Sequence, residues 1–199
     1  MNTSQIKSLA LSLALAAMAF LSALTLAYYT PEDTARSAIT ASGVSIELVE
    51  TRLNDGVEEA YPLSAVSGVL PSAELSKIAR VKNLEEPAWI RAQIIITVRA
   101  GNGEALPADG ISLDVDEARW LPGGDGYYYY YEALSRGAQS TPIFTTLRFS
   151  PTLGNEYQNS SVTVKVTAEA VQRANNPIPA DGGVMDIPGW GGAVRRSSL

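Results

Sequence analysis

The sequence predicts a mainly β fold, a single antiparallel β-sandwich of jelly-roll-like type that follows an N-terminal apolar export helix. Three observations predict it. Apolar and polar residues alternate with a period of two in several segments after residue 30. Turn-forming residues separate these segments. A stretch without charged residues, Leu9 to Ala27, opens the chain after Lys7.

The first 27 residues have the layout of a secretory signal peptide. Lys7 precedes the apolar stretch, and Thr25 and Ala27 place small residues at the two positions that a signal peptidase reads, so that Tyr28 would begin the mature chain. The alternative is an uncleaved membrane anchor, because the stretch is nearly long enough to span a bilayer. Both interpretations place the chain from Tyr28 onward outside the cytoplasm, secreted or at the cell surface.

Four segments after the leader are expected to be strands with one buried face, a pattern typical of antiparallel sheets. Their apolar faces are formed by Val44, Ile46 and Leu48; by Ile90, Ala92, Ile94, Ile96 and Val98; by Ile143, Leu147 and Phe149; and by Val162, Val164, Val166, Ala168 and Ala170. The expected turns are Asn54-Asp55-Gly56, Gly101-Asn102-Gly103, Asp109-Gly110, Pro122 to Gly126, and Ser150-Pro151.

These patterns divide the chain into four parts. Residues 1–27 are the signal peptide or anchor, and residues 28–43 are an N-terminal strand segment. Residues 44–174 form the sandwich. Residues 175–199 are rich in Gly and Pro and lack a period, which predicts a flexible C-terminal tail.

The composition favours a protein that is not an enzyme. The chain of 199 residues contains no histidine and no cysteine, which excludes a Ser-His-Asp relay, an imidazole base, a thiol nucleophile and a zinc site built from these ligands. The net charge of −6 disfavours a nucleic-acid partner. No cofactor is expected.

Four segments, taken in chain order, carry a family resemblance. They are Thr25-Leu-Ala-Tyr-Tyr-Thr-Pro-Glu-Asp33; Ile39-Thr-Ala-Ser-Gly-Val-Ser-Ile-Glu-Leu48; Leu70-Pro71 with Lys77 to Arg91; and Asn155 to Gln158 with Val162 to Gln172. The set resembles the TasA/camelysin family of exported proteins with SipW-type signal peptides. The chain departs from the family pattern at Pro71-Ser72, at Leu84 to Glu86 and in its C-terminal tail.

The resemblance implies a bacterial jelly-roll domain that signal cleavage releases and that assembles into extracellular fibres of a biofilm matrix. It also implies that the freed N-terminal segment inserts as a strand into the next subunit. The implied partners are a signal peptidase and then other copies or related matrix subunits, with membrane contact only through the uncleaved leader. Some members have been labelled metallopeptidases, but this chain has no His-Glu-x-x-His motif.

Residues 28–41 are the candidate donor strand, because Ala35, Ile39 and Ala41 share one face if the segment is extended. Two alternatives remain open. The segment could form the first edge strand of its own sheet, or it could be a disordered lead-in.

Five consecutive tyrosines form the second candidate site. On a strand, Tyr127, Tyr129 and Tyr131 share one face, and Tyr128 and Tyr130 share the other. One set belongs to the core. The other set could bind sugar rings or a protein surface, or could pack across strands within the sheet.

Acidic residues and one aromatic–arginine pair complete the candidates. Oxygen ligands for calcium could come from Asp109, Asp114, Asp116, Glu117 and Asp125, although their spacing does not match an EF-hand and solvated acids are the alternative. Trp89 and Arg91 share the strand face opposite Ile90, where they could stack for structural reasons. The sequence therefore favours a matrix-fibre subunit. The alternative is a monomeric surface module that binds a glycan, calcium or another protein.

Overall fold

The computed structural model describes residues 43–62, 66–67 and 71–198. Strands dominate these residues, every strand pair is antiparallel, and the only helical segments are three short 3-10 turns. The predicted mainly β, antiparallel fold is confirmed. The expected export helix lies outside the described residues.

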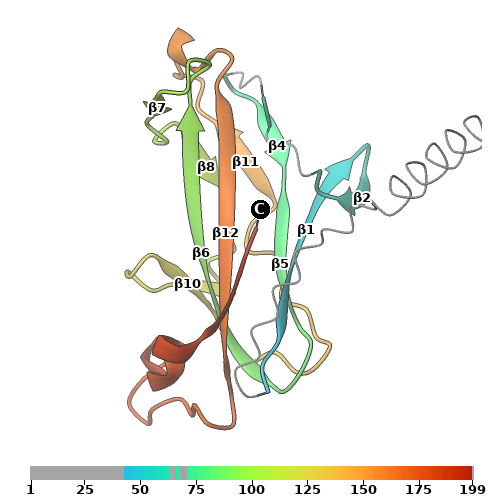
Figure 1. The fold of residues 1–199 in the computed structure, drawn as a ribbon, viewed down its shortest axis with the longest axis vertical. Coiled ribbons are helices and arrows are strands. Elements are labelled where there is room, and N and C mark those ends of the chain that lie inside the picture. The colour runs from blue at the N-terminus through green and yellow to red at the C-terminus, as the bar shows by residue number, and fades with distance from the viewer. Residues whose placement is uncertain (1–42, 63–65, 68–70, 199) are drawn as a thin grey trace, which may run out of the picture. The chain divides into compact units, whose positions relative to one another are not determined.

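One layer of the sandwich is a sheet with the strand order β13-β12-β6-β10-β9 (Figure 1). Its centre is the long ladder between β6 and β12, which pairs the two strands along their whole length. The strands are β6 (Ala88–Arg99), β9 (Trp120–Pro122), β10 (Tyr127–Tyr130), β12 (Ser161–Gln172) and β13 (Val194–Ser197). Two short strands, β3 (Val66–Ser67) and β7 (Ala105–Leu106), pair with β12 and β6 respectively.

The opposite layer consists of two smaller sheets, β2-β1-β5 and β4-β11-β8. The strands are β1 (Ile46–Asn54), β2 (Val57–Ala60), β4 (Glu74–Ser76), β5 (Ile78–Asn83), β8 (Ile111–Leu113) and β11 (Thr146–Phe149). Backbone bonds join the two sheets, because the amide of Ile143 donates to Ala79 at 2.8 Å and the amide of Lys77 donates to Thr145 at 3.0 Å. The segment before β11 thus continues the layer beyond β5.

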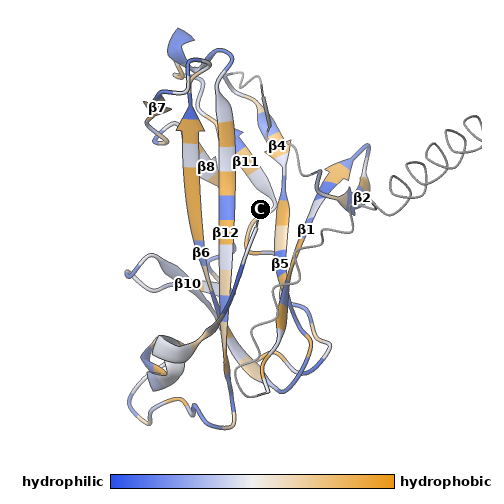
Figure 2. Cartoon of the chain, viewed as in Figure 1, coloured by the Kyte–Doolittle hydropathy of each residue, from blue (hydrophilic) through white to orange (hydrophobic). Residues whose placement is uncertain are grey.

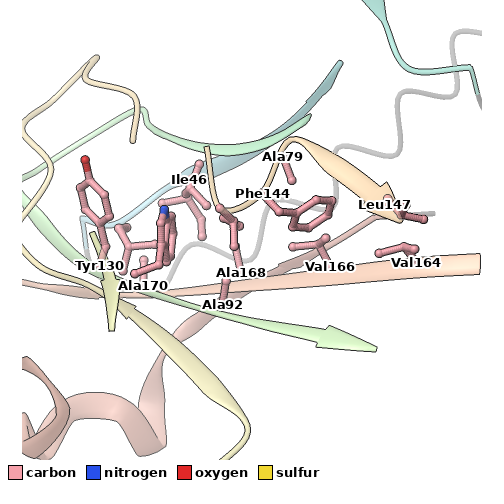
Figure 3. Close-up of a cluster of buried hydrophobic side chains, with 14 of the residues drawn as sticks. Ile46, Ala79, Ala92, Tyr130, Phe144, Leu147, Val164, Val166, Ala168 and Ala170 are labelled. Atoms are coloured by element: carbon pink, nitrogen blue, oxygen red, sulfur yellow. The ribbon is translucent and has the colours of Figure 1, made fainter. Parts of the chain in front are cut away.

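Side chains from both layers meet in one core (Figure 3). Ile46, Ala79, Phe144 and Leu147 come from the β1–β5–β11 side, and Ala92, Val166 and Ala168 come from the β6–β12 side. Phe144 is completely buried, and burial of such a side chain stabilises the fold by about 1.5–3 kcal/mol. The sandwich is therefore held by apolar packing between its layers.

Hydrophobic and polar residues alternate along β12 (Figure 2). The alternation of buried and exposed side chains, however, ends halfway along the strand. Val162, Val164 and Val166 are buried while Thr163 and Lys165 are exposed. From Thr167 to Val171 both faces are buried. Something therefore covers the outer face of this half of the strand.

The cover is the segment that was expected to be a flexible tail, residues 175–199, and this prediction is wrong for the part that the structure describes. The segment forms η2 (Val184–Asp186), η3 (Pro188–Gly192) and β13, which extends the sheet beside β12. The sandwich domain therefore continues past residue 174 and includes β13. The physical reason is that Val184, Ile187 and Trp190 bury their side chains on the sheet.

Turns occur at the predicted places between strands. The clearest is Asp55-Gly56, which joins β1 to β2 with φ angles of 50° and 81°. Positive φ at both central residues is the geometry of a type I′ hairpin turn, which Asp-Gly favours. The remaining 3-10 segment, η1 (Asn155–Tyr157), precedes β12.

Candidate functional site

The first half of β1 directs half of its backbone groups away from its partner β5. The amide of Leu84 donates to the carbonyl of Ser45 at 2.8 Å, so Ser45 and every second residue after it bond to the β5 side. Ile46 and Leu48 consequently present their N–H and C=O groups on the opposite edge.

Among the described residues, the second half of β1 is paired on that opposite edge, whereas β13 approaches β1 without pairing with it. Pairing with β2 begins at Thr51, opposite Ala60, and the amide of Tyr61 donates to the Glu50 carbonyl at 3.1 Å. No strand within the described ranges pairs with residues 46–49 on this side. This stretch, called the β1 edge below, has the geometry that accepts an added strand.

The residues predicted for export and strand donation lie outside the described part of the chain. They are Thr25, Ala27 and Tyr28 at the cleavage site, and Ala35, Ile39 and Ala41 in the donor strand. Their roles stay predictions. In the ranges that the structure does describe, no helix is long and apolar enough to cross a bilayer.

The four tyrosines of β10 divide between the two faces as their alternation predicts, whereas Tyr131 does not join Tyr127 and Tyr129. Tyr130 is buried in the core, with its ring centroid 4.9 Å from that of Trp120, and Tyr128 packs beside it. Tyr127 and Tyr129 lie on the outer face. Tyr131, just beyond the strand, is exposed next to Arg119.

The outer tyrosines do not form an open platform, because η2, η3 and β13 cover them. Residues 184–198, called the C-terminal strap below, place Trp190 edge-on against Tyr129 at a centroid distance of 5.4 Å. Tyr129 is only 3% exposed. Val184 and Ile187 complete the same apolar cluster. The geometry therefore favours packing within the sheet over sugar binding at Tyr127 and Tyr129.

A buried carboxylate joins the strap to the sheet. Glu169 is 2% exposed, and its Oε2 accepts hydrogen bonds from Arg91 Nε at 2.9 Å and Nη2 at 2.7 Å. Its Oε1 accepts from Arg195 Nε at 2.6 Å and from the Tyr127 hydroxyl at 3.2 Å. The Arg91 guanidinium lies between two rings, 4.0 Å from the Tyr127 centroid and 4.8 Å from that of Trp190.

The two arginines keep this carboxylate ionised. Burial by itself raises the pKa of Glu169, but the hydrogen bonds and positive charges of Arg91 and Arg195 outweigh it, and the pKa lies below its ordinary value of 4.5. A depressed pKa of this origin indicates a structural ion cluster, because a general acid needs a raised one. Arg91 was a candidate from its position in the sequence, but Glu169 was not. The only signal for Glu169 was its position on the polar face of β12.

Two of the acids considered as calcium ligands, Asp114 and Asp125, form hydrogen bonds with neighbouring protein groups. The Asp114 carboxylate accepts the amides of Thr145 at 2.8 Å and Thr146 at 2.7 Å. Asp125 accepts the Tyr129 hydroxyl at 2.7 Å. Asp109, Asp116 and Glu117 do not join them in a cluster: across the described ranges, no group of three or more acidic residues could hold a metal ion.

Comparisons of the chain with protein-family models, with curated proteins and with solved structures give no match. The resemblance to the TasA/camelysin family therefore rests on the sequence motifs alone and stays a prediction.

Proposed function

We propose that this chain is a secreted or cell-surface structural subunit that assembles by strand addition into an extracellular matrix fibre. The observation that carries the proposal is the β1 edge, which directly follows the expected donor segment, residues 28–43. The subunit partners are other copies of the chain or related matrix subunits.

An added strand would bond to the outward backbone groups of Ile46 and Leu48. Main-chain hydrogen bonds supply the affinity in this mode of recognition, and alternate side chains supply the specificity. Signal cleavage after Ala27 would free the donor segment from the membrane, so assembly would begin only after export. This order keeps an open strand edge from pairing inside the cell.

A structural role also fits the chemistry of the chain. Histidine and cysteine are absent from the sequence. The most buried carboxylate, Glu169, is neutralised by two arginines. The competing proposal, a monomeric module that binds glycans through the tyrosines, receives less support because the strap covers Tyr129.

The proposal is tested by comparing two purified chains, residues 28–199 and residues 38–199, by light scattering and electron microscopy. The longer chain should grow with concentration and form fibres, and the shorter chain should stay a folded monomer. Both contain the entire core that the structure describes. Equal fibre formation by the two chains would refute strand donation.

A matched pair of variants tests the acceptor edge in the chain 28–199. Leu48→Pro removes an outward amide and leaves the β5 ladder intact, whereas Leu48→Ala removes the same side chain and keeps the amide. Both should lose similar stability in a urea titration. Only Leu48→Pro should fail to extend fibres; equal extension by both variants would argue against the β1 edge as the acceptor.

A further inference from the structure

We infer that a groove at the start of β6 and the end of β12 is the docking site for residues 39–42 of the same chain. The groove has a volume of about 560 Å³, and its apolar walls are Pro87, Trp89, Ala174, Pro177 and Ile178. It is called the base groove below.

The described chain begins at the rim of the base groove. A Cβ atom added to Gly43 would lie 3.5 Å from Gln172 Nε2 and 3.7 Å from Glu86 Cγ, and both residues line the groove. The amide of Glu86 donates to the Gly43 carbonyl at 3.2 Å and fixes this position. Residue 42 is therefore attached directly at the mouth of the groove.

The distance that an extended chain can span from Gly43 determines which residues can reach the base groove. Ile39 is four residues from Gly43, so an extended chain places it at most about 14 Å away. The order Ile39, Thr40, Ala41, Ser42 alternates apolar and polar residues, and an extended conformation puts Ile39 and Ala41 on one side.

The chemistry of the groove fits these two side chains. Ile178 is 40% exposed at the rim, although it lies in an apolar groove next to Pro177. Docking of Ile39 would remove apolar surface of both isoleucines from water, while Thr40 and Ser42 face outward. The inference does not require the proposed fibre function. It narrows the donor strand, because only residues 28–38 would then be free to reach a neighbour.

The absence of natural cysteine permits a direct test. In the chain 28–199, Ile39→Cys is combined with Ile178→Cys, and the protein is mildly oxidised and run on a non-reducing gel. We expect a disulfide within one chain, with a yield that does not depend on protein concentration. The matched control combines Ile39→Cys with Ile95→Cys, because Ile95 is also exposed but lies six residues beyond Trp89 on β6, about 20 Å along the strand.

Two results would overturn the inference: a yield no higher than in the control, or disulfide-linked dimers alone, which would place the segment in a neighbouring copy. The same cysteine pair in the chain 38–199 separates this inference from the proposed function. That chain lacks most of the donor segment, so the internal disulfide should persist while fibres are lost.

A second measurement avoids oxidation. Ile39→Asp should increase hydrogen exchange in residues 86–89 and 172–178, because the groove loses its apolar occupant. Thr40→Asp adds the same charge one residue away, on the opposite side of the extended segment, and should leave the exchange unchanged. Identical exchange in the two variants would contradict docking.

Discussion

Glu169 and Arg91 lie directly opposite each other in the β12–β6 ladder, and two guanidinium nitrogens of Arg91 converge on a single carboxylate oxygen. The other oxygen of Glu169 remains for Arg195 of the C-terminal strap. One buried carboxylate therefore holds two cations, one from the body of the sheet and one from the end of the chain.

Removal of this carboxylate should strongly destabilise the protein. Glu169→Ala leaves Arg91, with a side chain only 13% exposed, as a buried cation without its partner, and such a loss costs about 3–5 kcal/mol. Arg195→Ala removes a cation whose side chain is 63% exposed, so it should cost much less, because solvent screens an exposed charge. Urea unfolding at pH 7 measures both values. Equal losses would show that Arg91 does not depend on Glu169.

Acidification should destabilise the protein through the same group. The folded-state pKa of Glu169 lies below 4.5, its ordinary value, so its contribution to stability is complete above that pH. The contribution is lost as the pH falls through the folded-state pKa, because the unfolded chain then binds the proton more tightly. Between pH 6 and pH 3, the free energy of unfolding should fall less in Glu169→Gln than in the unsubstituted chain. Urea titration at each pH measures this free energy. Asp114 and Asp125 also have depressed pKa values. These two groups should cause the pH dependence of the unfolding free energy that remains in Glu169→Gln. A slope unchanged in Glu169→Gln would contradict this assignment.

The strap should depend on its tryptophan. Trp190→Ala removes a ring that packs on Tyr129 and Arg91, and truncation of a buried tryptophan costs about 3–5 kcal/mol. Trypsin should then cleave after Arg195 faster than in the unsubstituted chain, as measured by mass spectrometry. Met185→Ala, at a 37% exposed position of the same strap, is the control and should change neither stability nor cleavage. Unchanged cleavage in Trp190→Ala would mean that β13 alone holds the strap.

Asp114 should be important for stability through its hydrogen bonds to the backbone. Asp114→Ala leaves the amides of Thr145 and Thr146 without their acceptor, which costs about 1–3 kcal/mol. Asp116→Ala should stay within about 0.5 kcal/mol, because the Asp116 carbonyl rather than its side chain accepts the amide of Trp120. Thermal melts of the two variants provide the comparison, and the opposite order of stabilities would refute it.

The sequence predicted the strands through their period, and this succeeded where one face meets the core. Val162 to Val166 and the two faces of the tyrosine run are examples. Alternation assigns a residue to a face, but it does not show what covers that face. Alternation therefore put Glu169 opposite the apolar face of β12 and Tyr129 on the same face as Tyr127, but it could not predict that both side chains are buried.

The ordered structure of the strap was not predicted, because its composition indicates a flexible segment whereas its packing on the sheet orders it. Residues 175–199 are rich in glycine and proline, which predicts flexibility. The opposing signal was Val184, Ile187 and Trp190, three apolar residues at intervals of three. Their burial depends on a distant surface formed by Trp89, Tyr129 and Val171. No local pattern reports such a surface.

The strap follows β6, β10 and β12 in the sequence, so it is synthesised after the sheet that it covers. Ser198 bonds to Val166 through its amide and its hydroxyl, both at 2.7 Å, so the sheet is closed on this side only once this residue has been made. Until Ser198 has left the ribosome, the aromatic surface on β6, β10 and β12 remains exposed to water. A nascent or truncated chain thus exposes to chaperones and proteases an apolar surface that is buried in the folded protein.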